Sequence, residues 1–128
     1  MDFDPARPIY QQIIDNFKKM MIRGELRQGD KIPSQREYAE MSKTNPNTVQ
    51  RAYRELENLN LVETLRGQGT FVSIHPEQLE SIRDEMASAV LGSCIIEMRS
   101  LGFNDKEVRD RLEQMQGVKK EAASDDRI

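Results

Sequence analysis

The segment 34–60 contains two closely spaced helix starts and constrains the fold more than any other part of the chain. Ser34 and Glu37 have the spacing of a capping box, in which each side chain bonds the amide of the other residue. Asn45 is a favoured N-cap, and Pro46 is favoured at the first helical position. The pattern predicts a short helix, a polar break over 42–44 and a second, sharply capped helix, which together form a helix-turn-helix.

The flanking segments predict a further helix before this motif and a hairpin after it. Pro8 opens the first helix and Gly24 ends it; residues 25–33 are predicted to form a turn. The apolar side of that helix consists of Ile9, Ile13, Ile14, Phe17, Met20 and Met21. The second capped helix has an apolar side of Val49, Ala52, Tyr53, Leu56 and Leu59, and Asn60 is suited to the left-handed stop. Strands are predicted over 61–65 and 70–74, around a glycine-rich tip, so the helix-turn-helix is winged.

The dipeptide His75-Pro76 is the best internal boundary. A long helix is predicted over about 76–101, and Gly102 ends it. Asn104 then caps a last helix, with Glu107 completing a second capping box and an apolar stripe of Val108, Leu112 and Met115. We therefore predict a mostly α (α+β) chain with a winged helix-turn-helix over 1–75, a two-helix dimerisation region over 76–116 and a flexible tail over 117–128.

The long helix is apolar over more than one face, so it needs partners on several sides. A second copy of the chain is the simplest source; the alternative is a core formed within one chain. The expected dimer contacts are Leu79, Ile82, Met86, Val90, Leu91, Cys94, Ile95 and Met98. Cys94, the one cysteine, is interpreted as a small buried hydrophobe rather than a redox sensor.

Composition excludes several classes of protein. A single cysteine permits no internal disulfide, the polar N-terminus is no signal peptide, and no apolar run is long enough to span a membrane, so we expect a cytoplasmic chain.

The net charge of −3 is unevenly distributed. Residues 1–75 hold 11 Lys/Arg and 10 Asp/Glu, whereas 76–128 hold 8 and 12, so the acidity lies in the C-terminal part. Binding to a phosphate backbone needs only a local cationic face, which this distribution of charge permits.

The polar side of the second capped helix has the chemistry of DNA recognition. It carries Asn47, Gln50, Arg51, Arg54 and Asn58. Asn and Gln pair with adenine and Arg with guanine, and the N-terminal residues of such a helix enter the major groove. Asn45, Thr48 and the free amides of the first turn suit phosphate. An ordinary solvated face is the alternative.

The hairpin tip also suits DNA. It consists of Arg66, Gly67, Gln68 and Gly69, and Thr70 follows. Glycine lets a backbone approach a duplex closely, and Arg66 suits phosphate or a narrow minor groove. An ordinary hairpin tip is the alternative; a nucleotide-binding loop is excluded because a strand follows it instead of a helix.

These segments resemble the GntR family of winged-helix regulators. The resemblance rests on Gly29-Asp30-Lys31-Ile32-Pro33-Ser34-Gln35-Arg36-Glu37, Asn45-Pro46-Asn47-Thr48-Val49-Gln50-Arg51-Ala52-Tyr53, Leu56-Glu57 and Gly67-Gln68-Gly69-Thr70-Phe71-Val72. It covers about residues 8–74, and the short C-terminal part is similar to the YtrA subfamily. The resemblance implies DNA contacts from Arg36, Asn45, Asn47, Thr48, Arg51, Arg66, Gly67, Gln68 and Gly69. Gln28 and Asn60 depart from the usual proline and glycine at turns, and Asn47 stands where many relatives carry arginine.

We therefore expect a homodimeric transcription regulator, a repressor that binds double-stranded DNA at an inverted-repeat operator. The alternative is a winged-helix protein-interaction or plasmid-maintenance module without promoter regulation. One histidine, His75, and one cysteine supply neither a catalytic set nor a metal cluster, so no enzyme, cofactor or metal is expected. Residues 76–128 are too few for the ligand-binding domains of larger GntR relatives, and no effector is assigned.

Overall fold

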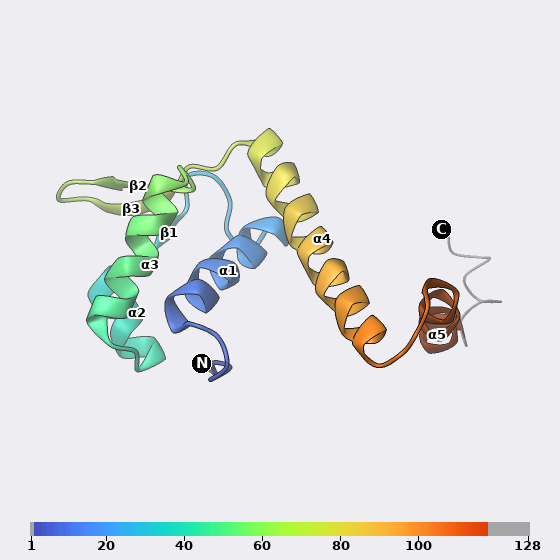
Figure 1. Ribbon diagram of the computed structural model, residues 1–128. Coiled ribbons are helices and arrows are strands. Elements are labelled where there is room, and N and C mark those ends of the chain that lie inside the picture. Colours follow the sequence, from blue (N-terminus) through green and yellow to red (C-terminus); the bar gives the residue numbers. More distant parts are fainter. Residues whose placement is uncertain (1, 118–128) are drawn as a thin grey trace. The chain divides into compact units, whose positions relative to one another are not determined.

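The computed structural model describes residues 2–117, which fold into five helices and a small sheet (Figure 1). The order is α1 (Ile9–Ile22), β1 (Lys31–Ile32), α2 (Gln35–Ser42), α3 (Pro46–Asn58), β2 (Val62–Leu65), β3 (Gly69–Val72), α4 (Pro76–Ser100) and α5 (Asp105–Gly117). The expected mostly α winged helix-turn-helix is confirmed. The tail predicted beyond Gly117 lies outside the described residues.

Helices α2 and α5 begin, and α3 ends, where the capping residues predicted. The amide of Glu37 donates to Ser34 Oγ at 3.1 Å and the amide of Ser34 donates to Glu37 Oε1 at 2.8 Å, which completes the capping box of α2. Asn104 and Glu107 exchange the same pair of bonds at α5. Asn60, at φ 61°, takes the left-handed conformation after α3. These ends were predictable because each depends on residues a few positions apart.

Three aromatic rings join α1, α2 and α3 at the centre of the N-terminal core. The ring of Phe17 lies 5.4 Å from that of Tyr38 and 5.7 Å, edge-on, from that of Tyr53. Around them pack buried aliphatic side chains from all three helices, the sheet and the following segment. These are Ile13, Ile14, Met21, Ile32, Ala39, Val49, Ala52, Leu56, Leu61, Val62, Val72 and Ile74. The core therefore fixes α3 against α1 and α2 and leaves its other side open.

Two side chains predicted on apolar faces are exposed instead. Ile9 is 40% exposed at the start of α1, and Leu59 is 38% exposed at the end of α3. Helical periodicity places each on or beside the correct stripe, but each lies at or near a helix end, where the neighbouring elements give it incomplete cover. Pro8 likewise stands at the N-cap of α1, one residue before the first helical position.

The sheet contains a strand that the sequence reasoning missed. β3 lies in the middle of the order β1-β3-β2 and pairs antiparallel with both neighbours. β1 pairs Lys31 with Phe71 and Ile32 with Thr70, within the segment predicted to be only a turn. A two-residue strand shows no alternation of its own, because it exists only through bonding to a distant partner. The predicted hairpin of β2 and β3 is present, and β1 pairs with its second strand.

The N-terminal compact unit extends beyond the predicted boundary at His75 and ends at Arg83. Ile82, on the second turn of α4, is buried, and Leu79 lines a pocket with Met21 and Leu26. The side-chain amide of Gln78 donates a 2.7 Å hydrogen bond to the carbonyl of Leu59, at the end of α3. The first turns of α4 therefore belong to the core of the winged helix.

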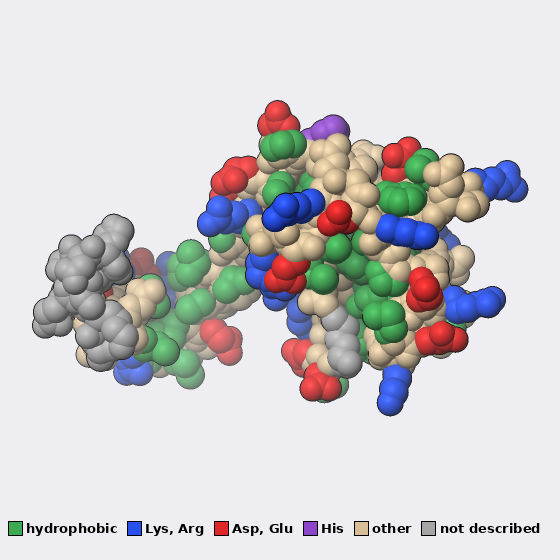
Figure 2. All heavy atoms as spheres, turned by 180° about the vertical axis from the view of Figure 1, so that it is seen from behind, with side chains coloured by type: hydrophobic (Ala, Val, Ile, Leu, Met, Phe, Trp, Pro, Cys, Tyr) green, Lys and Arg blue, Asp and Glu red, His purple; other side chains and the backbone are tan. Residues whose placement is uncertain are grey.

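The second unit, described over residues 84–117, contains the rest of α4 and α5 and buries none of its residues. Figure 2 shows hydrophobic side chains on the surface of this unit. The large apolar side chains that it exposes are Val90, Leu91, Ile95, Ile96, Leu101, Leu112 and Met115. Cys94 is exposed as well, so the expectation that it is buried is not met in the single chain.

No single helix within residues 2–117 is long and apolar enough to cross a membrane. Helices α4 and α5 meet the requirements of length and apolar composition only when taken together, and the chain bends by 115° between them.

Candidate nucleic-acid interface

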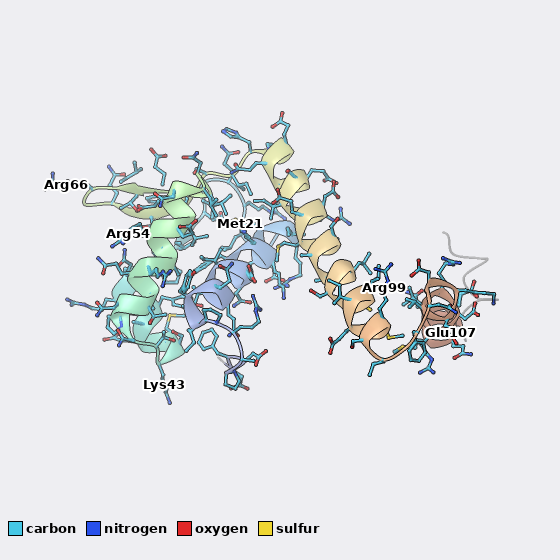
Figure 3. The ribbon with its side chains drawn as sticks, in the orientation of Figure 1. Met21, Lys43, Arg54, Arg66, Arg99 and Glu107 are labelled. Carbon is cyan, nitrogen blue, oxygen red and sulfur yellow. The ribbon has the colours of Figure 1, made fainter. Side chains whose placement is uncertain are left out.

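Helix α3 has one buried side and one polar side. Val49, Ala52, Tyr53 and Leu56 are buried against α1 and α2, as predicted. The opposite side, which we call the recognition face, exposes Asn47, Gln50, Arg51, Arg54 and Asn58. Figure 3 shows Arg54 on the side of α3 toward which the hairpin carrying Arg66 projects. The recognition face and the hairpin can therefore meet one ligand together.

The first turn of α3 differs from the prediction in its amide groups. Pro46 has no N–H, the amide of Asn47 donates to Asn45 Oδ1 at 2.7 Å, and the amide of Thr48 donates to the carbonyl of Asn45 at 3.0 Å. The amide N–H groups that were expected to be free are thus hydrogen-bonded to Asn45 or, at Pro46, absent, because Asn45 caps the helix and a proline follows it. Any phosphate contact here has to come from side chains. Asn45 is exposed and Thr48 is half-buried.

Arg51 does not extend freely from the recognition face. Its guanidinium carbon lies 3.8 Å from the centroid of the Tyr10 ring, on the first turn of α1. This distance is well within the range of a cation–π interaction. Sequence reasoning missed Tyr10, because the contact depends on how α1 packs against α3 and no local pattern specifies that packing.

Arg36 lies in an open groove between α2 and the start of α3. The groove has a volume of about 740 Å³ and is lined by Gln35, Arg36, Ala39, Glu40, Thr44 and Pro46. Arg36 is exposed on the first turn of α2. Arg36 and Pro46, the first residue of α3, therefore line the same concave surface.

The wing tip, residues 66–69, is a tight glycine turn. The amide of Gln68 donates to the carbonyl of Leu65 at 2.9 Å, and Gly67 has a φ of 77°. Arg66 projects from the tip (Figure 3), and Gly67 and Gln68 are also exposed, while Gly69 is half-buried. The hydroxyl of Thr64 donates to the carboxylate of Glu57, which ties the hairpin to α3. The wing is thus held in a defined position beside the recognition helix.

Lys31, which the sequence did not single out, adds a cation beside the wing. Its side chain runs across Gly69: a Cβ built on that glycine would lie 2.6 Å from Lys31 Cε. Lys31 also acts on Glu37, whose pKa is lowered first by hydrogen bonding from Ser34 and further by the positive charge of Lys31. Lys31 therefore stands between the wing and the start of α2.

The cations of this surface are not neutralised by neighbours. Within residues 2–117, the ion pairs are Arg7–Asp15, Arg23–Glu25, Arg99–Asp105 and Lys106–Asp110. None of them includes Arg36, Arg51, Arg54, Arg66 or Lys31. Although the chain carries a net negative charge, this surface keeps unpaired positive side chains, which is the requirement for binding a phosphate backbone.

A helix-turn-helix with a polar recognition face, followed by a hairpin with a basic tip, defines a winged helix-turn-helix DNA-binding protein. The family model described as bacterial regulatory proteins, gntR family, matches residues 9–72. The chain therefore belongs to the GntR family, and it is a DNA-binding transcription regulator.

Individual relatives agree with this assignment. An uncharacterized HTH-type transcriptional regulator of Bacillus subtilis, YhcF, is 42% identical over 86% of this chain and 91% of its own length. The HTH-type transcriptional repressor YtrA of the same organism is 48% identical over 57% of this chain and 58% of its own. A GntR family transcriptional regulator from Listeria monocytogenes has a similar structure, with a TM-score of 0.78, 33% identity and coverage of 88% of this chain and 98% of its own. The expected likeness to YtrA is confirmed, and a module without promoter regulation is not favoured.

Proposed function

We propose that this regulator is a homodimeric repressor that binds an inverted-repeat operator. The observation that supports a dimer is the exposure of apolar side chains on the second unit. Its described part buries no side chain, yet it exposes Val90, Ile96 and Leu101 by about two-thirds each: 68%, 67% and 68%. Exposed apolar side chains gathered on one short segment in this way are typical of a protein interface. A second copy of the same helices would cover them symmetrically.

The proposed dimer surface is narrower than the sequence predicted. Ile82 is already buried and Leu79 lines a pocket within the N-terminal unit, so neither is freely available to a partner. The expected contacts that remain on the second unit are Met86, Val90, Leu91, Cys94, Ile95 and Met98, to which the structure adds Ile96 and Leu101. The exposed Cys94 would be covered in the dimer.

For DNA, we propose a division of labour within each protomer. Asn47, Gln50 and Arg51 lie on the exposed N-terminal half of α3 and would read base edges in the major groove. The remaining groups would meet the sugar-phosphate backbone or the minor groove. These are Arg36, Asn45, Thr48, Arg54, Arg66, Gly67, Gln68 and Gly69, with Lys31 added by the structure.

Repression is proposed because the relative named YtrA is a transcriptional repressor. A dimer of winged helices binds two half-sites related by two-fold symmetry, about one helical turn apart or a multiple of it. The cytoplasm is the proposed location, since a bacterial regulator acts where the chromosome lies.

Two measurements test this proposal. In-vitro selection with the full chain should recover an inverted repeat, and light scattering should give about twice 14.8 kDa. Leu91, 56% exposed on α4, is the site for a disrupting charge. Leu91→Glu should yield a monomer that binds the repeat more weakly. The control Glu85→Lys changes a charge at an exposed position of α4 outside the apolar set and should leave the dimer intact. A monomeric wild type at micromolar concentration would overturn the dimer.

The sign of regulation is tested separately. A reporter under a promoter that contains the selected repeat should be transcribed less when the regulator is expressed, and Arg36→Ala should relieve that repression. Higher transcription with the regulator would show that it is an activator.

A further inference from the structure

The contact between Arg51 and Tyr10 links the proposed base-reading helix to α1. The Arg51 side chain is exposed, whereas Tyr10 is half-buried, and the guanidinium lies 3.8 Å from the ring centroid. Within residues 2–117 the other cation–π pair joins Arg111 to Phe103, outside the DNA-binding unit. Within the described residues, Arg51 is therefore the cation of the recognition face that contacts an aromatic ring.

The ring of Tyr10 is itself held in place. It stands on the first turn of α1, one turn before Ile13 and Ile14, both of which are buried in the core. Helix α1 packs directly against α3. The position of the ring relative to the recognition helix is thus set by the folded core.

Stacking and base reading use different parts of a guanidinium group. The cation–π contact occupies the flat face of the group, while its N–H donors point outward in the plane. A bidentate contact to guanine O6 and N7 uses those in-plane donors. With its guanidinium carbon 3.8 Å from the ring centroid, Arg51 can lie flat on Tyr10 and still read a base. A stacked side chain has also lost part of its rotamer freedom before DNA arrives, so less ordering is needed on binding.

We propose that Tyr10 is a positioning residue for Arg51: it holds the guanidinium in the plane from which Arg51 discriminates a base. This inference rests on the proposed base-reading role of Arg51. Tyr10 acts through its π face and not through its hydroxyl, so phenylalanine and tryptophan should replace it, whereas a leucine of similar bulk should not.

The test is a double-mutant cycle in the full chain, with fluorescence anisotropy on the selected operator and on operators carrying single base replacements. Arg51→Ala should flatten preference at one base position in each half-site. Tyr10→Leu should weaken cognate binding by about two- to tenfold and reduce preference at that same position. Tyr10→Phe should match the wild type, and Tyr10→Leu should have no further effect in the Arg51→Ala background.

The outcomes separate the two ideas. If Arg51→Ala leaves base preference intact, the base-reading role fails, and the positioning role falls with it. If Arg51→Ala flattens the preference but Tyr10→Leu leaves affinity unchanged or raises it, only the positioning role fails; tighter binding would mean that Tyr10 competes with DNA for Arg51. An equal loss from Tyr10→Leu in both backgrounds would indicate a purely structural role.

A spectroscopic measurement remains informative even where Tyr10→Leu lowers stability. The ring current of Tyr10 should shift the Arg51 side-chain proton resonances upfield in the free protein. That shift should persist in Tyr10→Phe and Tyr10→Trp and disappear in Tyr10→Leu. Unshifted Arg51 resonances in the wild type would show that Arg51 does not lie on the Tyr10 ring in solution.

Discussion

The hydroxyl of Tyr53 donates a 2.6 Å hydrogen bond to the carbonyl oxygen of Pro33, which ties the buried side of α3 to the residue before the capping box of α2. Tyr53 is 2% exposed, and its ring packs against Phe17 and Tyr38. One side chain thus fixes the recognition helix, through its ring and through its hydroxyl, against the helix that carries Arg36.

Removing that hydroxyl should lower stability while preserving the packing. Tyr53→Phe deletes the hydrogen bond and leaves the ring, so the expected loss in the free energy of unfolding is about 0.5–1.5 kcal/mol. Urea denaturation measures it. Tyr10→Phe is the matched control, because its hydroxyl has no described hydrogen bond, and it should cost little. Equal stability of Tyr53→Phe and wild type would show that the bond to Pro33 contributes nothing.

The same residue predicts a loss of stability at alkaline pH. Burial raises the pKa of Tyr53 above its ordinary value, with a smaller contribution from neighbouring Tyr38. The folded chain therefore keeps this proton to a higher pH than the unfolded chain. The stabilisation is complete below the unfolded pKa of about 10 and is lost as the pH rises above it. Above about pH 10, the free energy of unfolding should fall more steeply with pH in wild type than in Tyr53→Phe. Parallel pH profiles would contradict this expectation.

Gly69 should tolerate a side chain less well than its neighbour in the wing. Its φ is 126°, and an added Cβ would crowd Lys31 Cε at 2.6 Å, whereas Gly67 has a φ of 77° and open space around it. Gly69→Ala should destabilise the protein by about 1–3 kcal/mol, more than Gly67→Ala does.

A double variant separates the two causes at Gly69. Lys31→Ala removes the crowding but not the backbone strain, so Gly69→Ala should remain destabilising in that background. A full recovery would mean that contact with Lys31, and not φ, makes glycine necessary. Thermal unfolding of the four proteins provides the comparison.

What the sequence predicted and what it missed have a common physical reason. The capping boxes at Ser34 and Asn104 and the stop at Asn60 depend on residues within one or two turns, so the local sequence contains the necessary information. β1 and the support of Arg51 by Tyr10 depend on contacts across the fold. Hydrophobic periodicity indicates which side of a helix is apolar, but it does not say which neighbour covers that side. The partial exposure of Leu59 follows from this.

Arg66 provides a test of whether the wing takes part in binding. It projects from the hairpin tip (Figure 3), away from α3, and has no ion pair within residues 2–117. A contact with phosphate from this position carries no sequence information, so Arg66→Ala should weaken binding to cognate and random DNA alike. Loss of one phosphate contact per protomer should reduce the slope of log affinity against log salt by about one unit per protomer. Arg23→Ala is the control, since Arg23 is paired with Glu25 outside the site.

The pattern of loss identifies which groove or backbone group Arg66 meets. If preference is lost only at A·T-rich flanks and the salt slope hardly changes, the guanidinium lies in a narrow minor groove, where the negative potential is strongest. If affinity and slope both stay at their wild-type values, the wing tip is merely solvated, and binding rests on α2 and α3. Because Thr64 and Glu57 hold the hairpin against the recognition helix, deleting the Arg66 side chain should not move α3. Base preference at the positions read by Arg51 should therefore survive in Arg66→Ala, and its loss would show that the wing also positions the helix.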